Sequence, residues 1–352
     1  MKKVIVVLLL QLTLMFFTGC NKKQEPPVKQ ETALMNFDST DIKATPLNEN
    51  EAQNLLLKYR PLKGSTYTFR LTSITNDEGI IIADTTVNPK TSQTLTYLVA
   101  LNTNEIEEDS TYDISITIRS VKLDASMNGR NIHYQSGEKT DSATRNKFLE
   151  YEALQNIPFC ARIKQTGEVI ELYKTSKIID KVLSLRGIKD SIKENEKKAF
   201  QQNVEEGGLR PIVLQLFRKL SSNPVSKNAS WTVEQPFLNM NIFGFSSKQI
   251  FTLTGVEQLN NDKVASIDVR LVSQVQLNEQ AKKNNVKIDK ALLEGEGKLY
   301  FNMSKNMVQK SKTKVLLITS ISGVVPGPKG MQKFSSQKTV TTSNILELLE
   351  VK

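Results

Sequence analysis

The chain has 352 residues, of which 47 are Lys or Arg and 37 are Asp or Glu, giving a formal net charge of +10. This length allows one large domain or two ordinary domains, each with a proper core. A basic surplus can indicate a nucleic-acid partner, but the lysines here are scattered without an arginine–aromatic pattern, which argues against one.

The first residues have the features of an export signal. Lys2 and Lys3 form a short cationic start, and residues 4–17 are apolar except for Gln11 and Thr13. A helix needs roughly 20 apolar residues to cross the hydrocarbon core of a bilayer, so this run is too short for a stable span. A charged start, a short apolar run and small residues before a break are typical of a cleavable signal.

The end of this run, Phe17-Thr18-Gly19-Cys20, resembles the lipobox of bacterial lipoproteins, in which an apolar residue and two small residues precede an obligatory cysteine. Phe17 departs from the commoner leucine. The resemblance implies cleavage after Gly19, a diacylglycerol on the Cys20 thiol and acylation of the new amino terminus, and more than one acyl chain makes anchoring durable. Two alternatives are an ordinary signal peptide with an incidental cysteine and an uncleaved anchor.

The resemblance also predicts the location of the mature chain in the cell envelope. The family's sorting convention keeps lipoproteins with Asp after the cysteine at the inner membrane, whereas this chain has Asn21. In a host with two membranes we therefore expect the outer membrane, with the membrane as a partner through the lipid, and export again argues against nucleic acid. With Cys20 acylated, only Cys160 remains, so no internal disulfide can form.

A flexible tether is predicted for residues 20–50. This segment is polar, contains prolines and has few apolar groups, so it cannot bury enough surface to offset the entropy of ordering. Its one apolar patch, residues 33–37, can dock locally. The tether holds the folded part, which is expected to begin near residue 51, away from the bilayer.

Residues 51–175 are predicted to form a first β-rich half. Apolar and polar residues alternate with period two, with many aromatic residues and threonines, at 65–75, 94–103 and 110–127. A polar loop is predicted for residues 128–146. A hairpin that turns at Gln165-Thr166-Gly167 is expected to follow it.

Residues 176–224 are predicted to be a helical insertion, because the apolar period changes from two to the spacing of a helix. Pro211 suits the first turn of the last predicted helix. The apolar residues at helical spacing are Ile178, Ile179, Val182, Leu183, Ile188, Ile192, Ala199, Phe200, Val204, Ile212, Val213, Leu216, Phe217 and Leu220.

Residues 225–352 return to the strand pattern and form the second β-rich half. Long paired strands, a polar excursion and a later hairpin recur in both halves, which indicates an internal duplication by pattern. The sequence therefore predicts a mainly β, α+β protein with two similar curved antiparallel sheets and the helical insertion between them.

No motif in the sequence predicts a catalytic residue, a cofactor site or a metal site. The single histidine, His133, is interpreted as a surface residue, and Cys160 as a core residue in an alternating strand. One histidine and one free cysteine cannot build a zinc site. Gly295 and Gly297 lack the third glycine and the helix of a phosphate loop and indicate a bulge or a close backbone approach instead. Trp231 is expected to anchor the core or a sheet edge.

The whole chain resembles uncharacterised bacterial lipoproteins with one duplicated β-rich domain after a lipobox and a tether. More remotely, it is similar to periplasmic carriers of the LolA/LolB kind, whose half-open barrels have an apolar interior. We therefore expect a non-enzymatic envelope lipoprotein that binds an apolar ligand or a partner protein through the concave side of its sheets. The alternatives are a structural or scaffolding lipoprotein and a carboxylate-dependent envelope hydrolase. No pattern specifies the oligomeric state.

Overall fold

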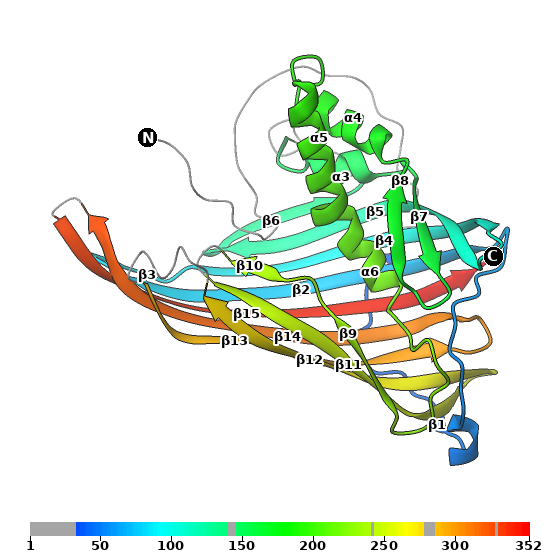
Figure 1. The fold of residues 1–352 in the computed structure, drawn as a ribbon. Coiled ribbons are helices and arrows are strands. Elements are labelled where there is room, and N and C mark those ends of the chain that lie inside the picture. Colours follow the sequence, from blue (N-terminus) through cyan, green and yellow to red (C-terminus); the bar gives the residue numbers. More distant parts are fainter. Residues whose placement is uncertain (1–32, 139–145, 241–242, 278–285, 328–329) are drawn as a thin grey trace.

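The computed structural model describes residues 33–138, 146–240, 243–277, 286–327 and 330–352. Its main feature is one strongly curved antiparallel sheet, with the α-helices gathered on one side of it (Figure 1). The strands follow each other through the sheet in the order β1-β11-β12-β13-β14-β15-β2-β4-β5-β7-β8. The mainly β, α+β class predicted from the period-two alternation is confirmed.

The strands up to the helical segment are β1 (Thr45–Pro46), β2 (Thr66–Ile82), β3 (Thr86–Val87), β4 (Lys90–Ile106), β5 (Thr111–Met127), β6 (Arg130–Gln135), β7 (Phe159–Lys164) and β8 (Val169–Tyr173). The strands after it are β9 (Ser230–Glu234), β10 (Leu238–Met240), β11 (Phe243–Leu259), β12 (Asp262–Leu277), β13 (Lys287–Asn302), β14 (Met307–Gly327) and β15 (Gly330–Val351). The helices are η1 (Glu49–Ala52), α3 (Leu149–Leu154), α4 (Ser176–Leu185), α5 (Glu194–Asn203), the π-helical turn η2 (Val204–Leu209) and α6 (Arg210–Leu216).

The two β-rich regions form one sheet, which corrects the expectation of two. β15, the last strand, returns to the first long strand, β2, and pairs with it from Ser335–Ile82 to Val351–Tyr67. This pairing satisfies the backbone groups of two strands that would otherwise be edges. Helices α4, α5 and α6 lie between residues 176 and 216, within the segment in which helical spacing was found.

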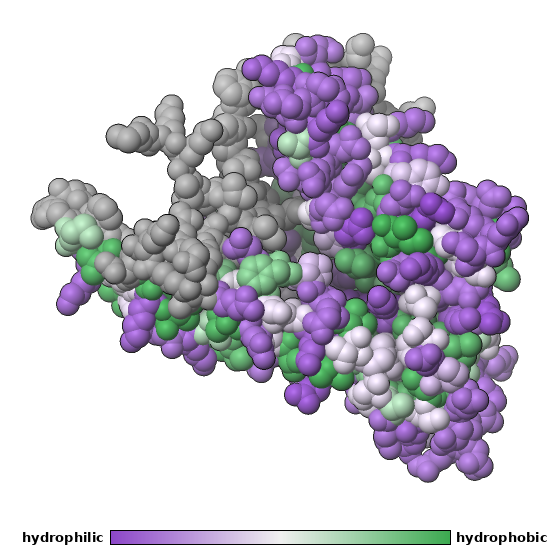
Figure 2. Space-filling view, in the orientation of Figure 1, coloured by the Kyte–Doolittle hydropathy of each residue, from purple (hydrophilic) through white to green (hydrophobic). Residues whose placement is uncertain are grey.

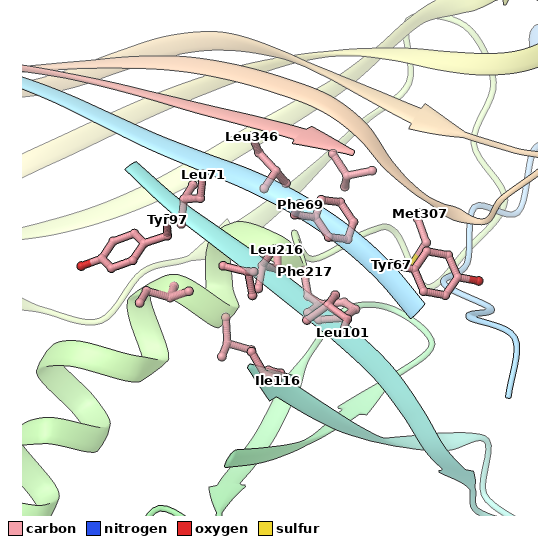
Figure 3. Packing of buried hydrophobic residues seen from close by; sticks show 14 of the residues in the cluster. Tyr67, Phe69, Leu71, Tyr97, Leu101, Ile116, Leu216, Phe217, Met307 and Leu346 are labelled. Atoms are coloured by element: carbon pink, nitrogen blue, oxygen red, sulfur yellow. The ribbon is translucent and has the colours of Figure 1, made fainter. Parts of the chain in front are cut away.

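The two faces of the sheet differ in what covers them. We call the face that carries Tyr67, Phe69 and Leu71 of β2 the inner face and the face that carries Thr68 and Arg70 the outer face, because side chains alternate along a strand. Phe69 and Leu71 lie close to Leu216 and Phe217 of α6 and to Leu346 of β15 (Figure 3). The main core therefore lies between the inner face and the helices.

A segment of the predicted tether lies against the outer face, which corrects its predicted extent of residues 20–50. We call residues 34–46 the strap. Met35 is only 2% exposed, the backbone oxygen of Leu34 accepts a hydrogen bond from Arg70 (2.9 Å), and β1 pairs with the free edge of β11. The buried Met35 belongs to the apolar patch of residues 33–37 for which local docking was predicted, whereas the polar contacts of the rest of the strap had no signal in the composition.

The predicted polar loop at residues 128–146 also needs correction. Its first part is β6, which pairs with β5 and places the Tyr134 ring against Phe148 and Tyr151. The predicted hairpin of β7 and β8 is confirmed, with Gly167 at φ +82° in its turn, a conformation that glycine adopts without strain.

Candidate functional site

Helix α6 turns two different faces toward the sheet. Ile212, Val213 and Leu216 point into the main core. The other face consists of residues at helical spacing that line a cavity of about 240 Å³ between α6 and the inner face: Pro211, Leu214, Gln215 and Arg218, which follows the helix end. The sheet side of this cavity is formed by residues of strands β11 to β15: Gln249, Val269, Leu271, Gly295, Glu296, Leu299, Ser311, Thr313, Lys314, Val315 and Asn344.

Arg218 brings a positive charge to this cavity without a carboxylate partner. Its backbone N–H donates to the Tyr59 hydroxyl (2.9 Å) and its backbone oxygen accepts from that hydroxyl (3.1 Å), so the main chain is fixed. In the described part of the chain, its guanidinium makes no hydrogen bond and no ion pair. Burial lowers the pKa of Arg218, and burial also raises the pKa of Tyr59, which therefore stays neutral beside it.

Gln215 adds a second polar group without a partner. Its side-chain oxygen is buried and accepts no hydrogen bond in the described structure. Such a buried acceptor lowers stability by about 1–3 kcal/mol unless another molecule satisfies it. Gln215 and Arg218 line the same cavity, so both groups can bond to one molecule there.

The inner face continues beyond α6 as an apolar surface. Phe243, Phe245 and Leu293 form a second buried cluster, separate from the main core. The partly buried residues packed against this cluster are Leu238, Leu271, Ile288, Ala291, Val315, Leu317 and Ile321. Since Leu271 and Val315 also line the cavity below α6, apolar surface runs without interruption from Arg218 into this cluster. We call the cavity and the apolar cluster together the trough.

Beyond the core residues, the inner face of β2 and β15 carries polar side chains. Asp77 and Lys338 form an ion pair of 2.7 Å there, and Ser73 and Thr75 share their face. This pair neutralises its own charges, in contrast to Arg218. The apolar cluster of the trough therefore lies on β11–β14, and the paired charges of Asp77 and Lys338 lie on β2 and β15.

The sheet opens between β12 and β13. These strands pair only from Val264–Asn302 to Leu271–Gly295, after which residues 272–277 keep their pairing with β11 and residues 287–294 with β14. The Ser273 hydroxyl bridges the gap by donating to the Leu293 backbone oxygen.

A cavity of about 470 Å³ lies at this opening, lined by Arg270, Leu271, Val272, Ser273, Leu292, Leu293, Glu294, Gly295, Glu296, Lys314 and Leu316. It shares Leu271 and Gly295 with the cavity below α6. Side chains of both faces line it, because Leu271 and Leu293 share a face with Leu299, whereas Arg270 and Glu294 lie on the opposite one. The trough therefore reaches the outer face through the sheet itself.

The outer surface of the helical segment is mostly hydrophilic, whereas hydrophobic patches lie along the sheet beneath it (Figure 2). The solvated face of the helices agrees with the scattered charges of the sequence. On this side of the molecule, the larger hydrophobic patches therefore lie on the sheet.

Of the residues singled out in the sequence, Gly295 lines the trough, whereas His133 and Cys160 do not. Gly19 and Cys20 lie outside the described residues. His133 lies on the outer face of β6, with Nδ1 2.6 Å from Asp124 and Nε2 3.3 Å from Glu138. No group of three or more His, Cys, Asp or Glu side chains suited to a metal occurs among the described residues.

Cys160, Trp231 and the glycines of β13 have structural roles. Cys160 is 4% exposed, and burial raises the pKa of its thiol. Trp231 on β9 stacks on Phe251, and its ring N–H donates to the Lys219 backbone oxygen (3.0 Å). A Cβ on Gly297 would clash with the Lys312 carbonyl oxygen of β14. The close backbone approach predicted at these glycines is therefore confirmed.

Fold and cavities together define a mainly β protein with one curved sheet and an inner trough that its helices partly cover. A family model matches residues 109–316, which is more than half of the chain. The chain therefore belongs to DUF6263, a family of unknown function. No curated protein matches the sequence.

Among solved structures, similar chains include one of lipovitellin, described for its lipid–protein interactions, with 10% identity and a TM-score of 0.40. That match covers 83% of this chain but only 26% of the lipovitellin chain. An outer membrane channel from Pseudomonas putida has 5% identity and a TM-score of 0.19, covering 86% of this chain and 100% of the channel. OpdQ from Pseudomonas aeruginosa has 7% identity and a TM-score of 0.18, covering 80% and 99%. At these TM-scores the likenesses carry no weight for function.

Within the described residues, no helix combines the length and the apolar composition that crossing a membrane requires.

Proposed function

We propose that this chain is a non-enzymatic, lipid-anchored protein of the bacterial cell envelope that binds an apolar ligand in the trough of its sheet. The observation that carries the proposal is the continuous apolar surface from the cavity below α6 to the cluster of Phe243, Phe245 and Leu293. A concave, mainly apolar site with a few polar groups is the usual form of a small-molecule binding site. The β12–β13 opening adds about 470 Å³ to this space.

The anchoring part of the proposal rests on the resemblance of residues 17–20 to a lipobox. Cys20 is the lipid attachment residue, cleavage follows Gly19, and Asn21 favours the outer membrane. In cells, Cys20→Ala is expected to abolish labelling with a radioactive fatty acid and to release the protein from the membrane fraction. Labelling that persists in this variant would contradict the assignment.

The binding part is tested by native mass spectrometry of residues 21–352, exported to the periplasm of a bacterial host. Every described element follows residue 32, so this chain contains the whole described structure. We expect an added mass of a lipid or another apolar small molecule that is lost when the chain is denatured. A bare protein mass would contradict ligand binding and favour the scaffolding alternative.

A further inference from the structure

The cavity below α6 holds a positive charge that the described protein does not neutralise. The charge of Arg70 on the outer face and the charge of Lys338 on the inner face are each neutralised by a carboxylate. Arg218 is partly buried and has no such partner among the described residues. It lines a cavity with the apolar Val269, Leu271 and Leu299, and the Glu296 and Lys314 that also line this cavity leave a net positive charge there. A charge that is partly withdrawn from water is normally paired, because losing hydration raises its free energy.

We propose that Arg218 pairs with the anionic head group, a carboxylate or a phosphate, of an amphiphile whose acyl chain lies in the trough. This inference rests on the proposed function and specifies its ligand class. Guanidinium groups bind both anions through two parallel hydrogen bonds, and the fixed backbone at Tyr59 holds Arg218 in place for them.

The surroundings of Arg218 fit the two ends of such a molecule. Gln215 offers an unpartnered side-chain oxygen in the same cavity, which accepts a hydrogen bond from a hydroxyl or a protonated group of the head. In the other direction, Leu271 and Val315 connect the cavity with Phe245 and Leu293, which provide an apolar surface for the acyl chain. Charge and apolar surface thus lie at opposite ends of one continuous site.

The single tryptophan of the chain is a suitable reporter for this site. Trp231 stacks on Phe251 of the inner face and bonds to the backbone of Lys219, the neighbour of Arg218. The experiment titrates residues 21–352 with oleate, with oleoyl lysophosphatidate and with neutral oleyl alcohol, and follows Trp231 fluorescence and calorimetric heat. Three proteins are compared: the unchanged chain, Arg218→Gln, and Arg218→Lys, which keeps the charge.

We expect the unchanged chain to bind at least one of the two anions about 10- to 100-fold more tightly than the alcohol, the range for a charge-assisted hydrogen bond in a desolvated site. Arg218→Gln should remove this preference without weakening the binding of the alcohol, and Arg218→Lys should keep a part of it. A preference for oleate assigns the site to a carboxylate, and a preference for lysophosphatidate assigns it to a phosphate.

Two results would overturn the inference, and they are distinguishable. If all three probes bind with one affinity, or if Arg218→Gln leaves the preference for the anions intact, Arg218 is not the head-group site, although the trough still binds apolar ligands. If none of the probes binds, alcohol included, the proposed function fails together with the inference.

Discussion

Two arginines on opposite faces of one sheet differ in what neutralises them. On the outer face, Arg70 pairs with Glu347 (2.8 Å), and Lys310 lies 3.6 Å from the same carboxylate, with all three residues at most 8% exposed. Over the inner face, Arg218 forms no ion pair in the described part of the chain, although Glu296 and Lys314 line the same cavity. The comparison teaches that burial alone does not assign a role to a charge: the paired arginine holds the structure together, and the unpaired one is available to a ligand.

The largest expected loss of stability comes from breaking the ion pairs of the outer face. Glu347→Gln removes the carboxylate that Arg70 and Lys310 share and leaves the buried Arg70 uncompensated, while Lys310 keeps only Asp38. We expect the free energy of unfolding to fall by about 3–5 kcal/mol in urea denaturation. Glu350→Gln is the control on the same strand, because Glu350 pairs only with the exposed Lys352 and should change stability by less than about 0.5 kcal/mol. Equal losses in both variants would show that the buried ion pairs contribute no more to the free energy of unfolding than the exposed pair does.

A smaller loss is expected where the inner face depends on close packing instead of charge. Gly297→Ala places a methyl group against the Lys312 carbonyl oxygen of β14 and should destabilise the chain by about 1–3 kcal/mol. Gly255→Ala is the matched control, because its Cβ would meet no atom within 4 Å. Thermal unfolding followed by circular dichroism compares the two. If Gly297→Ala unfolds at the same temperature as the unchanged chain, the close approach is not a constraint.

Arg218 and Arg70 are expected to differ in how their replacement by Met changes the free energy of unfolding. Without ligand, Arg218→Met should leave the free energy of unfolding unchanged or raise it by up to about 1 kcal/mol, because an uncompensated charge is replaced by an apolar group of similar length. Arg70→Met should lower it, since Glu347 then loses its closest partner. Urea denaturation of both variants measures the difference. A marked loss in Arg218→Met would assign Arg218 a structural role.

The smallest effect concerns the strap and depends on pH. The backbone and side chain of Thr40, followed by Lys310, hold the pKa of Asp38 at about 2, below its ordinary value of 3.8. Since the folded pKa lies below the unfolded one, this stabilisation is present above about pH 4 and is lost as the pH falls toward 2. Pepsin should therefore cut the strap faster at pH 2 than at pH 4, relative to an unstructured peptide. In Asp38→Asn the pH dependence should be reduced, and an identical dependence would exclude Asp38 as its source.

Local sequence patterns predict the strands and turns of this fold well, but they do not predict which distant strands pair. Alternation indicated the strands, and Thr166-Gly167 indicated the β7–β8 turn, because both depend on neighbouring residues. The joining of β15 to β2 depends on residues such as Leu346 and Leu71, which are far apart in the sequence. Nothing near either strand specifies this pairing, so two sheets were expected instead of one.

The candidate site was hidden from the sequence for a similar reason. Helical spacing revealed the face of α6 that carries Ile212 and Leu216, which enters the core. The opposite face, with Gln215 and Arg218, has the composition of a solvated surface. Only the fold shows that it covers a cavity and that, among the described residues, Arg218 forms no ion pair with an acid. Had the polar face of α6 been compared with the inner strands, the missing acid would have been the signal.

The strap has a mechanical consequence for the trough. It is fixed at one end to β2, β15 and β14, through Arg70, Glu347 and Lys310, and at the other end to the free edge of β11, through Thr45–Pro46. It therefore crosses the outer face and connects β15 with β11, and this connection opposes a separation of the two strands. The width of a ligand that the trough accepts would then depend in part on strap residues that do not contact the ligand.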